Sequence, residues 1–326
     1  MGKKYFTAML LALGAALALP QAGAASKEIT GTVSAVNGML TISGNFTYTF
    51  PTVDGSAIIL ANGTTAYSAT LTVGGTARTY VVMRPVAAPA TPPALMILLH
   101  PLGSNPVQMA NLSFITNYVA TQGFWVVLPQ GVNGQWQDDP ALDPDTDVQF
   151  ISQLIDTLVA QGVDSTRVYA AGYSDGGFMS ERLACEIPNQ IAAFGIDAGV
   201  VISTSPTYCK PSVQRPKLYI LGTADSIVPY NGGSIGLDSA AASISFWNGL
   251  QQCGTVANST LPTLVNDGTT VQLADYTCAA GNELRLYTVE DGGHAWPDGL
   301  TQLVGKTTQN LNASGIIWSF ASQYHL

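Results

Sequence analysis

Short apolar runs and longer amphipathic segments alternate along most of this chain. The run at 94–99 is apolar at every position, which predicts a strand buried on both faces. Between 146 and 160, apolar residues recur every three or four positions, which predicts an amphipathic helix with Thr146 and Gln149 as its capping box. A buried strand followed by an amphipathic helix is typical of an α/β protein.

The same two patterns continue along the chain. A hairpin is predicted first, with strands at 69–73 and 78–83 joined by Gly74-Gly75. Further strands are predicted at 124–128, 168–171, 192–196, 217–221 and 284–289, and further helices at 178–184, 240–250 and 316–324. Strands that are separated by helices pair mostly in parallel. The fold class is therefore α/β, with a mostly parallel sheet and helices on both faces.

The first 24 residues have the pattern of a secretory signal peptide. Lys3 and Lys4 precede an apolar run at 8–19, and small residues follow at 22–24. We therefore expect a secreted protein, extracellular or periplasmic. No later apolar run is long enough to span a bilayer, so no membrane association is expected after cleavage. Residues 25–66 are rich in Thr, Val, Ile and Gly, which predicts a small β-rich segment before a catalytic domain at 67–326.

Charge and cysteine content narrow the function classes. The formal charge is 12 − 21 = −9, and removal of the two leader lysines changes it to 10 − 21 = −11. Such an acidic chain has little attraction for nucleic-acid phosphates, so no nucleic-acid partner is expected. Cys185, Cys209, Cys253 and Cys278 allow three pairings of two disulfides in an oxidising compartment, and we favour pairing of neighbours in sequence. Neither a metal nor a cofactor is predicted, since no Cys-x-x-Cys or paired His occurs.

Two stretches match G-x-S-x-G, at 172–176 and 232–236. This motif exposes a nucleophilic serine only where a strand turns sharply into a helix. Ser174 has an apolar run before it and helix-forming residues after it, whereas Ser234 follows a loop that contains Pro229. Ser174 is therefore the predicted nucleophile, and Ser234 is interpreted as a loop residue.

A serine nucleophile needs a base, and the base needs a group that fixes its tautomer. In hydrolases with this motif the order along the chain is Ser, acid, His, which excludes His100. His325 is the penultimate residue of this sequence, where chain ends fray. His294 remains, in a Gly-rich loop beyond the strand at 284–289, and is the predicted base.

Three carboxylates compete for the role of the acid. Asp225 follows a predicted strand and a glycine turn, and it is our choice. Asp197 follows the strand at 192–196 and is its rival, although an aspartate in a turn often bonds only its own backbone. Asp291 shares the loop of His294 and is interpreted as a solvated loop residue.

An oxyanion hole needs two backbone N–H groups aimed at the developing negative charge. One is expected from Asp175, which follows the nucleophile. The other should come from the loop after the strand at 94–99, and Leu102 is the predicted donor because Pro101 has no N–H.

At these residues the chain resembles a family of secreted esterases, an α/β-hydrolase branch with feruloyl esterases, acetylxylan esterases and polyhydroxybutyrate depolymerase-like proteins. The motifs that carry the resemblance lie at 98–100, 133–136, 147–150, 172–177, 182–185, 222–225, 228–233 and 292–297. The resemblance implies Ser174, Asp225 and His294 as the triad, and the disulfides Cys185–Cys209 and Cys253–Cys278. The chain departs from the family at Pro101, where a glycine is usual, and residues 26–66 lie outside the resemblance.

The predicted function is that of a secreted serine carboxylic-ester hydrolase, most similar to feruloyl and acetylxylan esterases and acting through an acyl-enzyme. Its expected substrate is an ester, including one linked to plant cell-wall polysaccharide or a polyester. Trp136, Tyr173 and Trp296 are candidate walls of the substrate pocket, with core or rim packing as the alternative. The alternative function is an extracellular polyhydroxybutyrate depolymerase, followed by a non-catalytic binding protein of the same fold and a secreted peptidase.

Overall fold

The structure is a computed structural model that describes residues 32–36, 39–43, 47–53, 56–233, 236–300 and 304–326. The predicted signal peptide and Ser234 lie outside these ranges. No helix in the described part of the chain is both long enough and apolar enough to cross a membrane.

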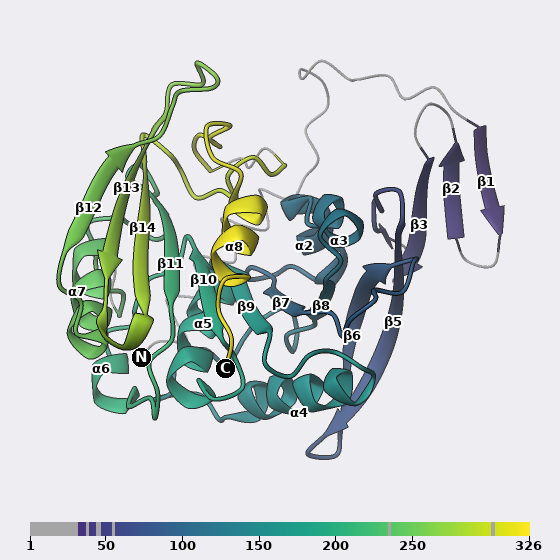
Figure 1. Ribbon diagram of the computed structural model, residues 1–326, viewed down its shortest axis with the longest axis horizontal. Coiled ribbons are helices and arrows are strands. Elements are labelled where there is room, and N and C mark those ends of the chain that lie inside the picture. Colours follow the sequence, from purple (N-terminus) through teal and green to yellow (C-terminus); the bar gives the residue numbers. More distant parts are fainter. Residues whose placement is uncertain (1–31, 37–38, 44–46, 54–55, 234–235, 301–303) are drawn as a thin grey trace.

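A sheet of ten strands forms the centre of the molecule (Figure 1). In spatial order the strands are β12 (Val256–Thr260), β13 (Thr270–Thr277), β14 (Glu283–Glu290), β11 (Lys217–Gly222), β10 (Ala193–Asp197), β9 (Val168–Tyr173), β7 (Leu95–Leu99), β8 (Trp125–Pro129), β6 (Thr76–Pro85) and β5 (Thr64–Val73). The strands from β14 to β8 pair in parallel, and the two strands at each edge are antiparallel. The mostly parallel sheet is thus confirmed.

Helices cover both faces of this sheet. Successive side chains of a buried strand point to opposite faces, so each such strand has an apolar surface on both sides that the helices bury. In β7, Leu95 and Ile97 join one core cluster while Met96 and Leu98 join the other. The first cluster includes α4 (Thr146–Ala160), α5 (Asp175–Glu186) and α7 (Ala240–Gln251). The second includes α2 (Pro106–Ser113), α3 (Thr116–Gln122) and α8 (Ala313–Ala321). The short helices α6 (Ser205–Tyr208) and η1 (Ala279–Gly281) lie in connections.

A separate antiparallel sheet contains the strands β1 (Thr32–Val36), β2 (Met39–Ser43), β3 (Thr47–Val53) and β4 (Ser56–Ala57). The chain that follows it packs on the main body: Ile58 and Leu60 are fully buried in the same cluster as α2 and α3. Asn111 of α2 donates to Ala57 O at 2.9 Å and accepts from Ile59 N at 2.8 Å. The division of the chain at residue 66 stays a prediction.

Several local expectations can be compared with these elements. The helix at 146–160 has the predicted ends, and the first hairpin is longer than predicted, at 64–85. The capping box is wrong: Asp145 is the N-cap and makes no capping bond, and the Thr146 hydroxyl donates to the Gln137 side chain instead. The pattern did not predict α2, α3, β12 or β13.

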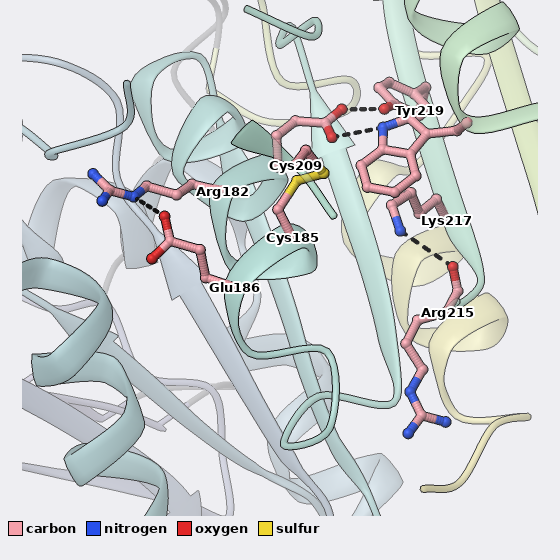
Figure 2. Close-up of a disulfide and its surroundings, with 9 residues drawn as sticks. Arg182, Cys185, Glu186, Cys209, Arg215, Lys217 and Tyr219 are labelled. Carbon is pink, nitrogen blue, oxygen red and sulfur yellow. Dashed lines mark hydrogen bonds and ion pairs between the residues drawn. A yellow bond between two sulfur atoms is a disulfide. The ribbon is translucent and has the colours of Figure 1, made fainter. Parts of the chain in front are cut away.

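Both disulfides implied by the resemblance are present. Cys185 near the end of α5 is bonded to Cys209, and Cys253 beyond α7 is bonded to Cys278 beyond β13. Figure 2 shows the first of them beside the end of α5.

Next to this disulfide the core holds a cluster of buried ionisable groups (Figure 2). Glu181 accepts hydrogen bonds from the Tyr219 hydroxyl and, at 2.8 Å, from Trp247 Nε1. Lys217 Nζ lies 3.7 Å from the centre of the Trp247 ring and donates to Arg215 O at 3.3 Å. Burial lowers the pKa of Lys217 to about 7, against the opposing attraction of Glu181.

Candidate active site

Ser174 stands at a sharp turn between β9 and α5. Its backbone has φ 56° and ψ −118°, a strained conformation for a residue with a side chain. The two flanking glycines make the turn possible: a Cβ at Gly172 would lie 1.9 Å from Gly176 O, and one at Gly176 would lie 2.3 Å from Leu99 O. The residues at 172–176 therefore form a strand–turn–helix elbow, the local structure that this motif needs to present a nucleophile.

The loop after β14 places His294 against Asp225, which follows β11. His294 Nδ1 lies 2.7 Å from Asp225 Oδ2, and both side chains are buried. The other oxygen, Asp225 Oδ1, accepts from the amides of Ile227 and Val228, each at 2.8 Å. Because a carboxylate only accepts, His294 carries its proton on Nδ1 and leaves Nε2 as an acceptor.

The loop of His294 is also anchored to the elbow. The Tyr173 hydroxyl donates to His294 O at 2.9 Å, and Tyr173 directly precedes Ser174. The Ser174 amide donates to Asp197 O at 2.9 Å. His294 Nε2 is buried and has no hydrogen-bond partner among the described residues, so the structure contains no bond from Ser174 Oγ to it. Such a bond is often formed only in the complex with substrate.

The rival residues lie elsewhere. Asp197 is buried, and no hydrogen bond or ion pair joins its side chain to His294 among the described residues. Burial together with the Asp225 charge holds the pKa of its carboxyl well above the usual range. The Asp291 side chain is exposed and lies 4.0 Å from Lys306. His325 is exposed at the end of the described chain.

His100, excluded as the base, organises the loop of the predicted oxyanion donor Leu102. Its ring is fully buried: Nε2 accepts from Gly131 N at 3.0 Å, and Nδ1 donates to Pro101 O at 2.8 Å. Burial lowers the pKa of His100 to about 4, so the ring is neutral at pH 7. No hydrogen bond from the Leu102 amide is present within the described structure.

Asp175, the second predicted oxyanion donor, is attached to the same neighbouring loop through its side chain. Its Oδ2 accepts from Trp136 N at 2.9 Å, and Trp136 Nε1 donates to His100 O at 2.9 Å. Gly103 N donates to Gly134 O at 2.7 Å. The loop at 130–136 therefore connects the segments that carry both predicted donors. Sequence reasoning missed this connection, although 98–100 and 133–136 were among the motifs of the resemblance.

The three predicted pocket aromatics are almost completely buried. Trp136 bonds to the backbone of His100, and Tyr173 bonds to the backbone of His294. Trp296 donates to the Ser314 hydroxyl at 3.2 Å. All three contact the loops around the elbow, and their role as pocket walls stays a prediction.

With this geometry described, the chain can be compared with known proteins. Residues 81–253 match the family model of phospholipases and carboxylesterases. The chain belongs to the phospholipase/carboxylesterase family. Its fold is that of the α/β-hydrolases, as the sheet and the elbow also show.

Individual relatives agree with this assignment. The NocK protein of Nocardia uniformis subsp. tsuyamanensis is 30% identical over 74% of this chain and 78% of its own length. Feruloyl esterase B of Piromyces equi is 29% identical over 63% of this chain, but only 40% of its own length. The structure of the acetyl xylan esterase from Aspergillus awamori superposes with a TM-score of 0.52 at 13% identity, covering 70% of this chain and 94% of the other. The two sequence relatives, both named as esterases, support an ester hydrolase, and the superposed structure shows the shared fold alone.

Proposed function

We propose that this chain is a secreted serine carboxylic-ester hydrolase of the feruloyl or acetylxylan type, with Ser174 as nucleophile, His294 as base and Asp225 as acid. The contact of His294 Nδ1 with Asp225 at 2.7 Å carries the proposal. It fixes the tautomer in which Nε2 can take the proton of a serine.

In the proposed reaction, Ser174 Oγ attacks the ester carbonyl carbon while His294 Nε2 takes the hydroxyl proton. The imidazolium then protonates the departing alkoxide, and the C–O bond of the ester breaks to leave an acyl-enzyme. Water, deprotonated by His294, attacks the acyl carbon, and the acid leaves as Ser174 recovers its proton. Asp225 holds the ring and stabilises its transient positive charge.

The developing oxyanion needs donors that are already in place. We assign the amides of Asp175 and Leu102 to this task. Support comes from the loop at 130–136, which joins the Asp175 carboxylate and the His100 ring through the bonds described above. These bonds hold together the two segments that carry the predicted donors.

The test compares the mature protein with Ser174→Ala and Ser234→Ala on p-nitrophenyl acetate. We expect Ser174→Ala to lose at least about 10³-fold in kcat, because the acyl-enzyme cannot form. Ser234→Ala is the matched control, since it removes the serine of the second G-x-S-x-G stretch, and its rate should stay near that of the unaltered protein. Retention of activity by Ser174→Ala would overturn the assignment.

The acyl class is tested separately. Feruloyl esterase B of Piromyces equi is a relative, which supports methyl ferulate as a substrate. The bifunctional acetylxylan esterase/xylanase XynS20E of Neocallimastix patriciarum is another, which supports acetylated xylan. Hydrolysis of these two substrates is expected to exceed clearing of a polyhydroxybutyrate suspension. The reverse order would favour the polyester depolymerase, and intact folding with no turnover of any ester would favour a non-catalytic binding protein.

A further inference from the structure

A groove on the α3–α8 layer shares no lining residue with the proposed active site. It has a volume of about 410 Å³, and its walls include Tyr118 and Gln122 of α3 and Trp318 and Ser319 of α8. Among the residues that the structure describes, no charged side chain lines it. The chain as a whole carries a net charge of −9, so a groove lined by uncharged aromatic and amide side chains differs in charge from the average of the molecule.

The Trp318 ring is held rigidly in this groove. One face stacks on Phe124, with ring centres 3.8 Å apart and an angle of 12° between the planes. The Trp318 and Tyr169 rings are nearly perpendicular, with centres 6.1 Å apart, and Trp318 Nε1 donates to Gln122 Oε1 at 3.3 Å. Trp318 nevertheless remains partly exposed. A partly exposed aromatic ring that such contacts already hold in place can bind a ligand with little further loss of side-chain entropy.

The Tyr118 side chain of the groove is also held in place. The Tyr118 hydroxyl donates to Asn312 Oδ1 at 2.7 Å, and the same oxygen caps α8 by accepting from Gly315 N at 2.7 Å. A Cβ at Gly315 would lie 2.8 Å from the Tyr118 hydroxyl, so a glycine is needed for this approach. The two aromatic rings are therefore held in place by bonds between α3 and α8.

Polar groups that have no partner remain along the groove. Gln122 uses its oxygen for Trp318, and no bond from its NH₂ group is present among the described residues. The hydroxyls of Ser319 and Ser322 likewise make no hydrogen bond within the described structure. Together they offer donors and acceptors beside an aromatic platform.

We propose that this groove binds a segment of a neutral polysaccharide. A sugar ring presents C–H groups that pack on an aromatic face, and hydroxyls that both donate and accept. A nucleotide would bring phosphate next to a lining without a cation, inside an acidic protein. A polyester chain has only acceptor oxygens and would leave the serine oxygens without donors.

The groove is connected to the loop that carries His294. Ala313 N, at the start of α8, donates to Pro297 O at 3.2 Å, and Trp296 Nε1 bonds to Ser314. A polysaccharide held along α8 would thus lie on the same layer as the end of this loop, so that an ester on the chain could be presented to the site. The proposal concerns binding and does not depend on the catalytic assignment.

The experiment follows the indole N–H signals of the five tryptophans by NMR while xylohexaose is added to the full-length protein. The Trp318 signal is identified by its absence in Trp318→Phe. We expect it to shift with saturation at millimolar sugar, while the signals of Trp136 and Trp296 beside the proposed active site stay in place. Gln122→Ala should weaken binding about threefold to tenfold, the effect of losing one hydrogen bond. Asn117→Ala, an exposed amide on α3 outside the groove, is the matched control and should bind normally.

Three results would overturn the proposal. The first is no shift of any indole signal up to about 10 mM xylohexaose, a concentration that reveals even weak binding. The second is a shift of Trp136 or Trp296 in place of Trp318, which would locate the sugar at the proposed active site. The third is adsorption to polyhydroxybutyrate granules that is lost in Gln122→Ala and kept in Asn117→Ala, which would assign the groove to a polyester.

Discussion

Replacing Asp225 by asparagine is expected to inactivate the enzyme, although size and shape hardly change. The reason lies in the oxygen that does not face His294. Asp225 Oδ1 accepts two backbone N–H groups, from Ile227 and Val228, each at 2.8 Å. In the variant the amide oxygen must remain there, because an NH₂ group cannot accept. The NH₂ group then replaces Oδ2, 2.7 Å from His294 Nδ1.

The magnitude follows from the tautomer. An NH₂ group donates to Nδ1, so the ring proton moves to Nε2, the nitrogen that must accept the proton of Ser174. In serine proteases this substitution lowers kcat about 10⁴-fold, which corresponds to about 5 kcal/mol in the activation free energy. We expect a loss of the same order here. Asp225→Ala imposes no tautomer, so the asparagine variant should be no more active than the alanine variant.

The assay is the steady-state rate on p-nitrophenyl acetate, with folding checked by circular dichroism. Asp197→Asn is the matched control: burial raises the pKa of its carboxyl, and among the described residues His294 bonds to Asp225 and not to Asp197, so the rate should stay within about threefold. If Asp197→Asn were as damaged as Asp225→Asn, or if Asp225→Asn kept more than a tenth of the rate, the reasoning would be refuted.

Three further predictions concern folding and the loop of Leu102. Lys217→Met removes a buried amine whose pKa is lowered to about 7. Between pH 7 and 10 the unfolded chain binds more protons at Lys217 than the folded chain does, so the unfolding free energy of the unaltered protein should rise relative to that of the variant by up to about 4 kcal/mol. A difference that stays constant with pH in urea titrations would show that Lys217 does not lose its proton in the fold. His100→Ala should lower kcat about 10-fold to 100-fold with little change in KM, because the hydrogen bonds of the ring with Pro101 O and Gly131 N, which position the loop of Leu102, are lost. A change in KM alone would contradict this positioning role. Gly172→Ala should abolish activity, because its Cβ would clash with Gly176 O in the elbow. Gly249→Ala in α7 is the control: no atom lies within 4 Å of its new Cβ, so it should raise the unfolding free energy by about 0.5–1 kcal/mol. An active, stable Gly172→Ala or a destabilised Gly249→Ala, measured by rates and thermal melts, would contradict the packing argument.

The pattern of apolar residues predicted helices that bury one face and strands that are buried on both faces. The helix at 146–160 and the buried strand β7 are both of this kind, and their residues determine their structure locally. In contrast, β12 is exposed at every position, and its identity as a strand depends on pairing with β13. A pattern that reports burial contains no signal for such an edge strand.

The candidate site shows the same limit. Chain order together with the position of His325 at the chain end was sufficient to propose His294. Asp197 ends β10 and Asp225 follows β11, its parallel neighbour, and the sequence does not show that Asp225 is the one that reaches the ring. The side-chain roles of His100 and Asp175 depend on a loop more than 25 positions away in the sequence, at 130–136 and beside Trp136. Short motifs could indicate those segments, but only the three-dimensional arrangement shows that they are bonded to each other.

The order of strands in the sheet also has a consequence for the nascent chain. The elbow after β9 can form once β7 and β8 are made. In contrast, β14, whose loop carries His294, comes late in the sequence, and its partners among the described strands are β11 and β13. On the proposed assignment, a chain that is still emerging from the ribosome has a serine but no base. Hydrolytic activity would then appear only after the last strand of the sheet has been inserted.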